Sequence, residues 1–206
     1  MPFRATIHSM ILQTAGALTL SALLMFLPAG TFAWPQGWLF LALFFGLSQA
    51  MGLWLLRTDP ALLAARMRSP LSGDQAPRDR VVIVAILAGF VAWLVFVALD
   101  AKRFGWSHAP AWAQVVGAAL IVAAFWGWME VLRANTFAAT TIQLQAERGQ
   151  TVISSGPYAL VRHPMYAFAL FLMVGAPLLL GRCGGWRGSA CSSPCWPPGR
   201  WARRRC

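Results

Sequence analysis

The sequence predicts an all-α protein, a polytopic bundle of about five membrane-spanning helices. Of its 206 residues, 58% are hydrophobic and only 11% are charged, and the mean hydropathy is +0.59. Soluble domains average about 45–50% apolar and about 25% charged residues, so a soluble fold would not bury this much apolar surface. Apolar runs long enough to span a bilayer alternate with polar segments along residues 1–180. We therefore expect one bundle over this range rather than separate domains.

The basic residues lie mostly between the apolar runs. A formal net charge of +11 often indicates nucleic-acid binding, but Lys and Arg beside membrane spans mark cytoplasmic segments instead. This distribution predicts no nucleic-acid partner and a cytoplasmic N-terminus, which carries Arg4. The expected location is a bacterial inner membrane, with an endoplasmic-reticulum-like membrane as the alternative. The basic excess is clearest after the second apolar run, where Arg57, Arg66, Arg68, Arg78 and Arg80 outnumber Asp59, Asp74 and Asp79.

The first span is expected at Met10–Leu27, which would be about 27 Å long as a helix. A cleaved signal peptide is the alternative, but this run is longer than a signal core and no small-x-small site follows it. Proline and glycine within 28–35 predict a turn. The second span is expected at Trp38–Leu56, and Trp34 and Trp38 lie where an interfacial aromatic belt would be.

Three further spans and one short helix complete the expected bundle. Pro60–Met67 is predicted as an interfacial helix after the second span. The third and fourth spans are expected at Val81–Leu99 and Pro110–Leu132, joined by an outer loop with nearly balanced charge. The fifth apolar run is Met165–Leu180. A transporter or channel is a weaker interpretation of these spans, because they show no inverted repeat and no charge set at mid-membrane depth.

Glu130 is the ionisable residue inside a predicted span. Such a residue is by default a functional candidate. Arg133 lies three residues later on the same predicted helix, a spacing that allows an ion pair within the helix. We favour the ion pair over a catalytic role.

The polar stretch QLQAERGQTVISSGPYALVRHPMY, Gln143 to Tyr166, lies between apolar segments. Thr151–Ile153 is β-rich and predicts a short extended segment, and 154–157 predicts a turn. Pro164 would interrupt or restart a helix and leave backbone carbonyls unpaired. Irregular backbone at membrane depth requires cover by protein or a cavity. We therefore predict a pocket at the cytoplasmic surface whose polar lining holds a water-soluble cofactor, while the bundle admits an apolar substrate.

Taken singly, the side chains of this stretch have ordinary interpretations. His163 alone would be an interfacial hydrogen-bonding residue. Arg162 alone would be a cation that reaches out of the apolar layer to the surface. Tyr158 and Tyr166 alone would be belt residues. Only their order along the chain favours a shared site.

The run G-P-Y-A-L-V-R-H-P-M-Y, Gly156 to Tyr166, resembles the signature of the isoprenylcysteine carboxyl methyltransferase family, which is related to the membrane phospholipid methyltransferases. The preceding T-V-I-S-S and an upstream glutamine also fit. The similarity is specific over residues 135–181, whereas the earlier spans agree only in hydropathy. It implies methyl transfer dependent on S-adenosyl-L-methionine, possible carboxyl O-methylation, and a lipidic or apolar substrate.

The resemblance also assigns residues. The expected catalytic residues are Arg162, His163 and Tyr166, and no metal is expected. Gln150 stands where the family commonly has histidine. Transfer from a sulfonium to an ionised carboxylate needs no general base, so alignment would supply up to roughly 7–11 kcal/mol. An aromatic face would favour the cation by about 0.5–2 kcal/mol. The expected cofactor-binding set is Gln143, Gln150, Thr151, Val152, Ile153, Tyr158, His163, Pro164, Met165 and Tyr166.

The segment Gly181–Cys206 differs from the family and from the rest of the chain. It holds all 4 cysteines and six arginines but no Asp or Glu, and it lacks an apolar run of spanning length. The family instead continues with a returning helix and an Arg and Glu-Glu segment. Cys191 and Cys195 are spaced as C-x₃-C, but unpaired thiols are a better interpretation than a zinc site.

We therefore expect residues 181–206 to be an aberrant tail without a fixed fold. A shifted reading frame shortly after Gly181 is our hypothesis for its origin. The alternative function is accordingly a truncated, catalytically inactive membrane protein of the same ancestry.

Overall fold

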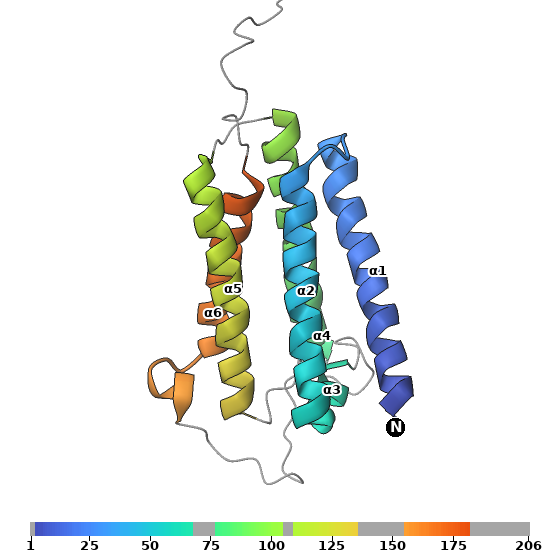
Figure 1. The fold of residues 1–206 in the computed structure, drawn as a ribbon, viewed down its shortest axis with the longest axis vertical. Coiled ribbons are helices and arrows are strands. Elements are labelled where there is room, and N and C mark those ends of the chain that lie inside the picture. The colour runs from blue at the N-terminus through green and yellow to red at the C-terminus, as the bar shows by residue number, and fades with distance from the viewer. Residues whose placement is uncertain (1–2, 68–76, 105–108, 136–154, 182–206) are drawn as a thin grey trace, which may run out of the picture.

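The computed structural model describes residues 3–67, 77–104, 109–135 and 155–181. Within these ranges the chain is helical and contains no strand. Five long helices run alternately in opposite directions, with the N-terminus at the same end as the start of the last helix (Figure 1). They are α1 (Phe3–Ala29), α2 (Pro35–Thr58), α4 (Pro77–Ala98), α5 (Ala111–Ala134) and α6 (Pro164–Leu180); the short elements are α3 (Pro60–Met67), the π-helix η1 (Leu99–Phe104) and the 3₁₀-helix η3 (Gly156–Ala159).

The helices bear out the predicted membrane bundle. Four described stretches are long and apolar enough to cross a bilayer: Thr6–Ala29, Pro35–Thr58, Arg80–Phe104 and Ala111–Ala134. The fifth predicted span is α6, which is apolar but has only 17 residues. At 1.5 Å per residue α6 is about 26 Å long, at the lower limit for a transmembrane helix.

The turn between α1 and α2 is set by glycine and proline. Gly30 has φ +69°, a region that glycine occupies without steric cost, and its N–H donates to the Phe26 carbonyl at 3.0 Å. Pro35 stands at the start of α2, where its missing N–H leaves no helical hydrogen bond unmade. The Trp38 indole N–H donates to the Phe32 carbonyl at 3.0 Å and ties the turn to α2.

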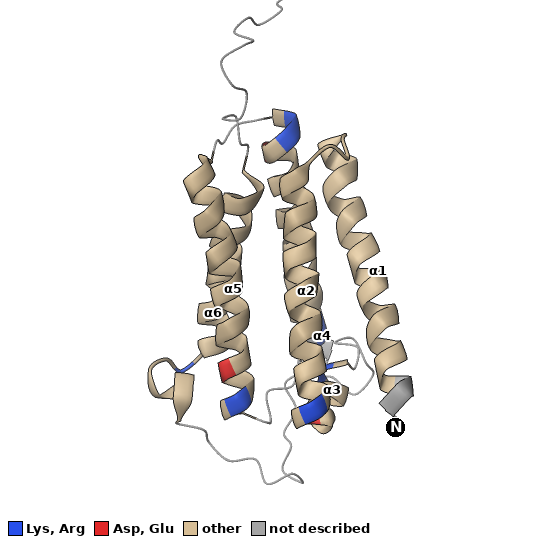
Figure 2. Ribbon diagram, in the orientation of Figure 1, with Lys and Arg blue, Asp and Glu red and all other residues tan. Residues whose placement is uncertain are grey.

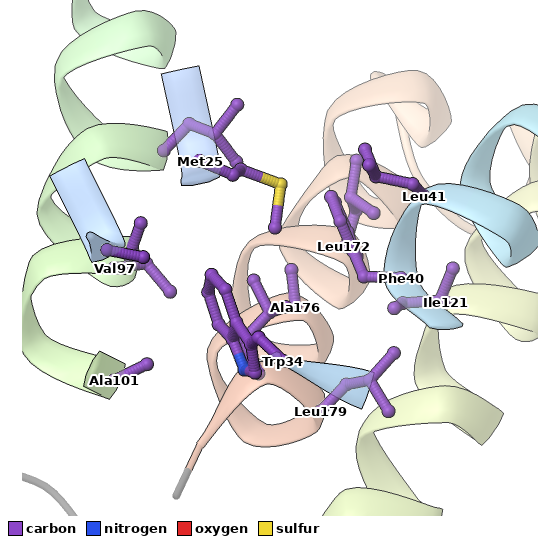
Figure 3. Close-up of a cluster of buried hydrophobic side chains, with 14 of the residues drawn as sticks. Met25, Trp34, Phe40, Leu41, Val97, Ala101, Ile121, Leu172, Ala176 and Leu179 are labelled. Carbon is purple, nitrogen blue, oxygen red and sulfur yellow. The ribbon is translucent and has the colours of Figure 1, made fainter. Parts of the chain in front are cut away.

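The belt expected at Trp34 and Trp38 is only partly correct. Trp38 is exposed, but Trp34 is 1% exposed and belongs to the core. Its ring meets Phe26 edge to face. Figure 3 shows it among side chains from α1, α4, η1 and α6. The loop expected after the third span is also corrected, because Asp100, Lys102 and Arg103 lie in η1, which continues α4 by one π-helical turn.

Asp59 both ends α2 and begins α3. Its N–H donates to the Leu55 carbonyl at 2.8 Å, and its carboxylate Oδ1 accepts from the Leu62 N–H at 2.9 Å. Such a side-chain cap followed by proline is a strong signal for a helix start. Leu62 and Leu63 are buried beside Leu132 of α5. The helix predicted at Pro60–Met67 is confirmed with the predicted bounds. Burial lowers the pKa of the Arg66 guanidinium near its end.

The α5–α6 pair is the most extensive helix contact of the described chain. A Cβ on Gly117 would lie 2.6 Å from the Gly175 carbonyl oxygen, and one on Gly175 would lie 2.8 Å from the Gly117 carbonyl oxygen. Such small residues let two membrane helices touch backbone to backbone. Nearer the site, the Phe168 ring occupies the space that a side chain on Gly127 would need. These contacts fix α6, and hence the residues before it, relative to α5.

The described charged residues lie toward the two ends of the bundle (Figure 2). Lys102 and Arg103 lie at the end formed by η1. Six arginines lie at the opposite end, at helix termini or just beside them: Arg57, Arg66, Arg78, Arg80, Arg133 and Arg162.

Candidate functional site

The candidate site lies where η3 and the start of α6 meet the end of α5. Gly156 opens η3 with φ +61°, a left-handed conformation that costs about 1–2 kcal/mol for a residue with a side chain. A Cβ here would also approach the Ala134 Cβ at 3.3 Å. Pro157 then accepts from the N–H groups of Leu160 and Val161 at 3.2 and 3.1 Å. The G-P-Y motif is therefore a tight turn that lies against the last turn of α5.

Tyr158 is held by a residue from α5. The Asn135 side-chain amide donates to the Tyr158 hydroxyl oxygen at 2.9 Å, in a partly buried position. Asn135 is the residue that ends α5, and its backbone N–H donates to the Val131 carbonyl at 2.9 Å. The bond joins two segments 23 residues apart.

Pro164 restarts the helix, as one of the two predicted outcomes requires. It is the first residue of α6, with His163 as the residue before the helix. Proline at this first position removes no hydrogen bond of α6 itself, because the first N–H groups of a helix have no partner within it. The His163 carbonyl accepts from the N–H groups of Tyr166 and Ala167 at 3.1 and 3.3 Å.

Trp128 of α5 braces the same turn. Its indole N–H donates to the Met165 carbonyl at 3.1 Å. Pro164 is among the largest fully buried side chains, and Met165 is half-buried. The middle of the R-H-P-M-Y motif is therefore a packed support for its outer residues.

The three expected catalytic residues are exposed. The His163 and Tyr166 rings lie 5.8 Å apart between centroids, tilted by 40°, and Tyr166 is 72% exposed. Arg162 is exposed immediately before them. The structure thus brings His163 and Tyr166 together, while Tyr158 faces α5. Gln143, Gln150, Thr151, Val152 and Ile153 lie outside the described residues, as does the tail from 182 to 206.

The ion pair expected at Glu130 is confirmed. The Glu130 carboxylate binds the Arg133 guanidinium across one helical turn. The Arg133 guanidinium also lies 5.3 Å from the Trp54 ring centroid of α2, a cation–π contact. Arg133 therefore connects α5 to α2 near the end of α5.

Two residues that sequence reasoning left without a role, Asn135 and Trp128, contact site residues. Both partnerships join positions far apart in sequence, 23 and 37 residues. A polar residue at the end of an apolar helix was the available signal for Asn135.

A hollow of about 230 Å³ lies between α1 and α2. It is close to the α1–α2 turn, at the opposite end of the bundle from the start of α6 (Figure 1). Its lining is apolar apart from Thr19, whose hydroxyl donates to the Ala15 carbonyl at 2.8 Å. Among the described residues there is no cluster of three or more metal-ligating side chains.

The comparison with known proteins finds a similarity in the part of the chain that forms this site. Residues 112–189 match the family model for phospholipid methyltransferase. No curated protein and no solved structure gives a significant match. The matched segment contains α5, η3 and α6, and it reaches eight residues beyond Gly181. This part of the bundle is therefore similar to a membrane methyltransferase domain, a family related to the one that the G-P-Y and R-H-P-M-Y motifs resemble.

Proposed function

We propose that the protein is a membrane methyltransferase that uses S-adenosyl-L-methionine and acts on a lipidic or apolar substrate. The observation that carries this proposal is the coincidence of the matched segment, 112–189, with the α5–η3–α6 unit. Carboxyl O-methylation, as in the isoprenylcysteine carboxyl methyltransferases, is the reaction we favour. It requires positioning rather than a base at neutral pH.

The described residues suit such a cofactor chemically. The donor supplies a methyl group on a positively charged sulfonium. The exposed rings of His163 and Tyr166 offer aromatic surface at the site, and aromatic faces attract cations. The Tyr158 hydroxyl and the Arg162 guanidinium are further polar groups of the unit, and Arg162 suits an anionic carboxylate. Gln143 and residues 150–153 complete the proposed cofactor set.

The bundle supplies the apolar side of the reaction. The outward faces of α4, α5 and α6 expose large hydrophobic side chains, among them Ile86, Trp126 and Leu170. These faces suit the hydrocarbon of a bilayer. A substrate dissolved in the bilayer reaches the α5–α6 end without leaving its solvent, whereas the cofactor arrives from water. We place that end, which also carries the N-terminus, on the cytoplasmic side.

Binding and turnover test the proposal together. The full-length protein, purified in detergent, should bind S-adenosyl-L-methionine by calorimetry and transfer its methyl group to an isoprenylated cysteine analogue. His163→Ala and Tyr166→Ala should weaken binding, whereas Leu170→Ala, on the lipid-facing side of α6, should not. Absence of binding by the folded wild type would refute the proposal.

The composition of residues 181–206 favours a second candidate, an inactive protein of the same ancestry. This segment has six arginines and no acidic residue. Binding of the cofactor without turnover would support the inactive protein. A replacement tail that carries the family's Arg and Glu-Glu segment should then restore activity.

A further inference from the structure

We infer that Asn135 is a positioning residue that orients the Tyr158 hydroxyl so that its proton is donated to an acceptor atom of the methyl donor. This inference rests on the proposed function and assigns a role in cofactor binding to the hydrogen bond between Asn135 and Tyr158. The carrying observation is the direction of that bond. The amide Nδ2 of Asn135 is the donor and the phenol oxygen is the acceptor, at 2.9 Å.

The direction of the Asn135–Tyr158 hydrogen bond determines whether the Tyr158 O–H proton is still available for another acceptor. A phenol has one O–H donor and lone pairs that accept. In the described part of the chain the Tyr158 hydroxyl accepts from Asn135 and donates to no other residue. Its proton is therefore available for an oxygen or nitrogen outside this pair. The hydroxyls, carboxylate and ring nitrogens of a nucleoside–amino acid conjugate are such acceptors.

Both partners are held by their own backbones. Asn135 is fixed by its N–H bond to Val131 at the end of α5. Tyr158 lies in η3, which is closed by the bonds to the Pro157 carbonyl and docked through Gly156 on Ala134. Holding a donor in place in advance avoids ordering costs when a ligand binds.

Reversing the bond tests the inference. In Asn135→Asp the carboxylate only accepts at neutral pH, so the phenol turns its proton to Asp and can no longer donate to the ligand. We expect the affinity for S-adenosyl-L-methionine to fall by about 2- to 12-fold, as in Tyr158→Phe, the range that corresponds to one hydrogen bond. Asn135→Leu removes the amide but leaves the phenol proton, so its loss should be smaller.

The new negative charge needs its own control. Asn135→Asp in the Tyr158→Phe background measures the effect of the charge on a cationic ligand without the phenol. After this correction, the effects of Asn135→Asp and Tyr158→Phe should not add. The loss in Asn135→Asp should also shrink as the pH falls toward the carboxyl pKa, because a protonated carboxyl donates as the amide did. A residue that only stabilises the fold would give neither result.

A ligand-free measurement keeps this inference separate from the proposed function. The chain has 2 tyrosines, so Tyr166→Phe leaves Tyr158 as the only one. The intensity ratio of the tyrosine Raman doublet distinguishes an accepting phenol from a donating one. It should report an accepting phenol in Tyr166→Phe and a donating phenol when Asn135→Asp is added.

The outcomes divide cleanly. If the wild type fails to bind S-adenosyl-L-methionine, the proposed function is refuted. Independently of binding, an unchanged Raman ratio in Asn135→Asp would refute the direction of the hydrogen bond. If the wild type binds and Tyr158→Phe weakens binding but Asn135→Asp does not, the positioning role of Asn135 is refuted. Weaker binding in both variants, with a changed ratio, supports it.

Discussion

Gly156 satisfies two requirements of the site with one missing side chain. Its φ of +61° opens η3, and its lack of Cβ lets the turn approach Ala134. Asn135, the residue after Ala134, then donates its side-chain hydrogen bond to the Tyr158 hydroxyl. The local geometry of the motif thus depends on a glycine that contacts no ligand in our proposal.

Replacing Gly156 with Ala should lower both stability and cofactor affinity. The left-handed conformation should cost about 1–2 kcal/mol of the free energy of unfolding, and the Ala134 contact should shift η3 away from α5. Gly30→Ala is the matched control, because Gly30 has φ +69° but open space around it. Thermal melting should show similar losses in both variants, whereas calorimetry should show weaker binding only in Gly156→Ala. Equal affinities would separate the turn from the site.

Replacing Glu130 with Gln should leave methyl transfer intact. The Glu130 and Arg133 side chains are 36% and 46% exposed, and ion pairs this exposed contribute about 0.2–1 kcal/mol. The expected result is a small loss of stability that salt reduces. Loss of turnover without loss of folding would mean that Glu130 has a catalytic role instead.

At the scale of single residues, the sequence predicted side-chain contacts reliably only where both residues lie on one helix. Glu130 and Arg133 are three residues apart, and a helix fixes their proximity before any tertiary contact forms. Asn135 and Tyr158, or Trp128 and Met165, meet only after α6 docks on α5. The sequence shows their chemistry but not their distance.

At the scale of elements, α5 and α6 form the framework that holds the motif. Their backbones meet at Gly117 and Gly175, and Phe168 enters the space beside Gly127. Helix existence was predictable, because the apolar runs and prolines mark it: Pro60 and Pro164 begin α3 and α6 as expected, and Pro35 begins α2 a few residues early. Glycines inside an apolar run do not reveal which helix they will face.

Replacing Gly117 with Ala should weaken the α5–α6 pair. A methyl group 2.6 Å from the Gly175 oxygen and from the Leu179 nitrogen meets backbone that cannot rotate away. Overpacking of this kind costs about 1–3 kcal/mol. Gly89→Ala on α4 is the control, because nothing lies within 4 Å of its added Cβ. Unfolding in detergent should distinguish them, and equal stability would contradict the close contact.

Replacing Trp128 with Phe should loosen the first turn of α6. The change removes the N–H bond to the Met165 carbonyl, with an expected loss of about 0.5–1.5 kcal/mol. Hydrogen exchange at the backbone amides of residues 166–169 should increase. Trp126→Phe is the control, because Trp126 is 64% exposed on the same helix. Unchanged exchange in Trp128→Phe would show that the bond does not support α6.

At the scale of the whole molecule, charge divides the two ends of the bundle. Described arginines concentrate at the end with the candidate site, while Lys102 and Arg103 stand at the other end, with Lys102 6.0 Å from the Trp34 ring centroid. This asymmetry was visible in the sequence, because it needs only the order of spans and loops. The packing of Trp34 into the core was not, because a tryptophan near a span end suits the core and the interface equally.

Single cysteines should reveal the orientation in the membrane. In a variant without the four native cysteines, Thr31→Cys between α1 and α2 should react with an impermeant maleimide added outside intact cells. Thr58→Cys at the end of α2 should react only after the membrane is opened, because the arginine-rich end is expected inside. The reverse pattern would invert the proposed topology.

The paired glycine contact also limits how the protein can move. Two helices that meet main chain to main chain near one end, and lock a phenylalanine ring into a notch nearer the other, cannot slide or splay without losing both contacts. If α6 tilts, α5 is therefore expected to tilt with it, and η3, which carries Tyr158, is expected to move together with both helices. We therefore expect the bundle to open where α1 and α4 meet the other helices, because those contacts are less extensive than the contact between α5 and α6.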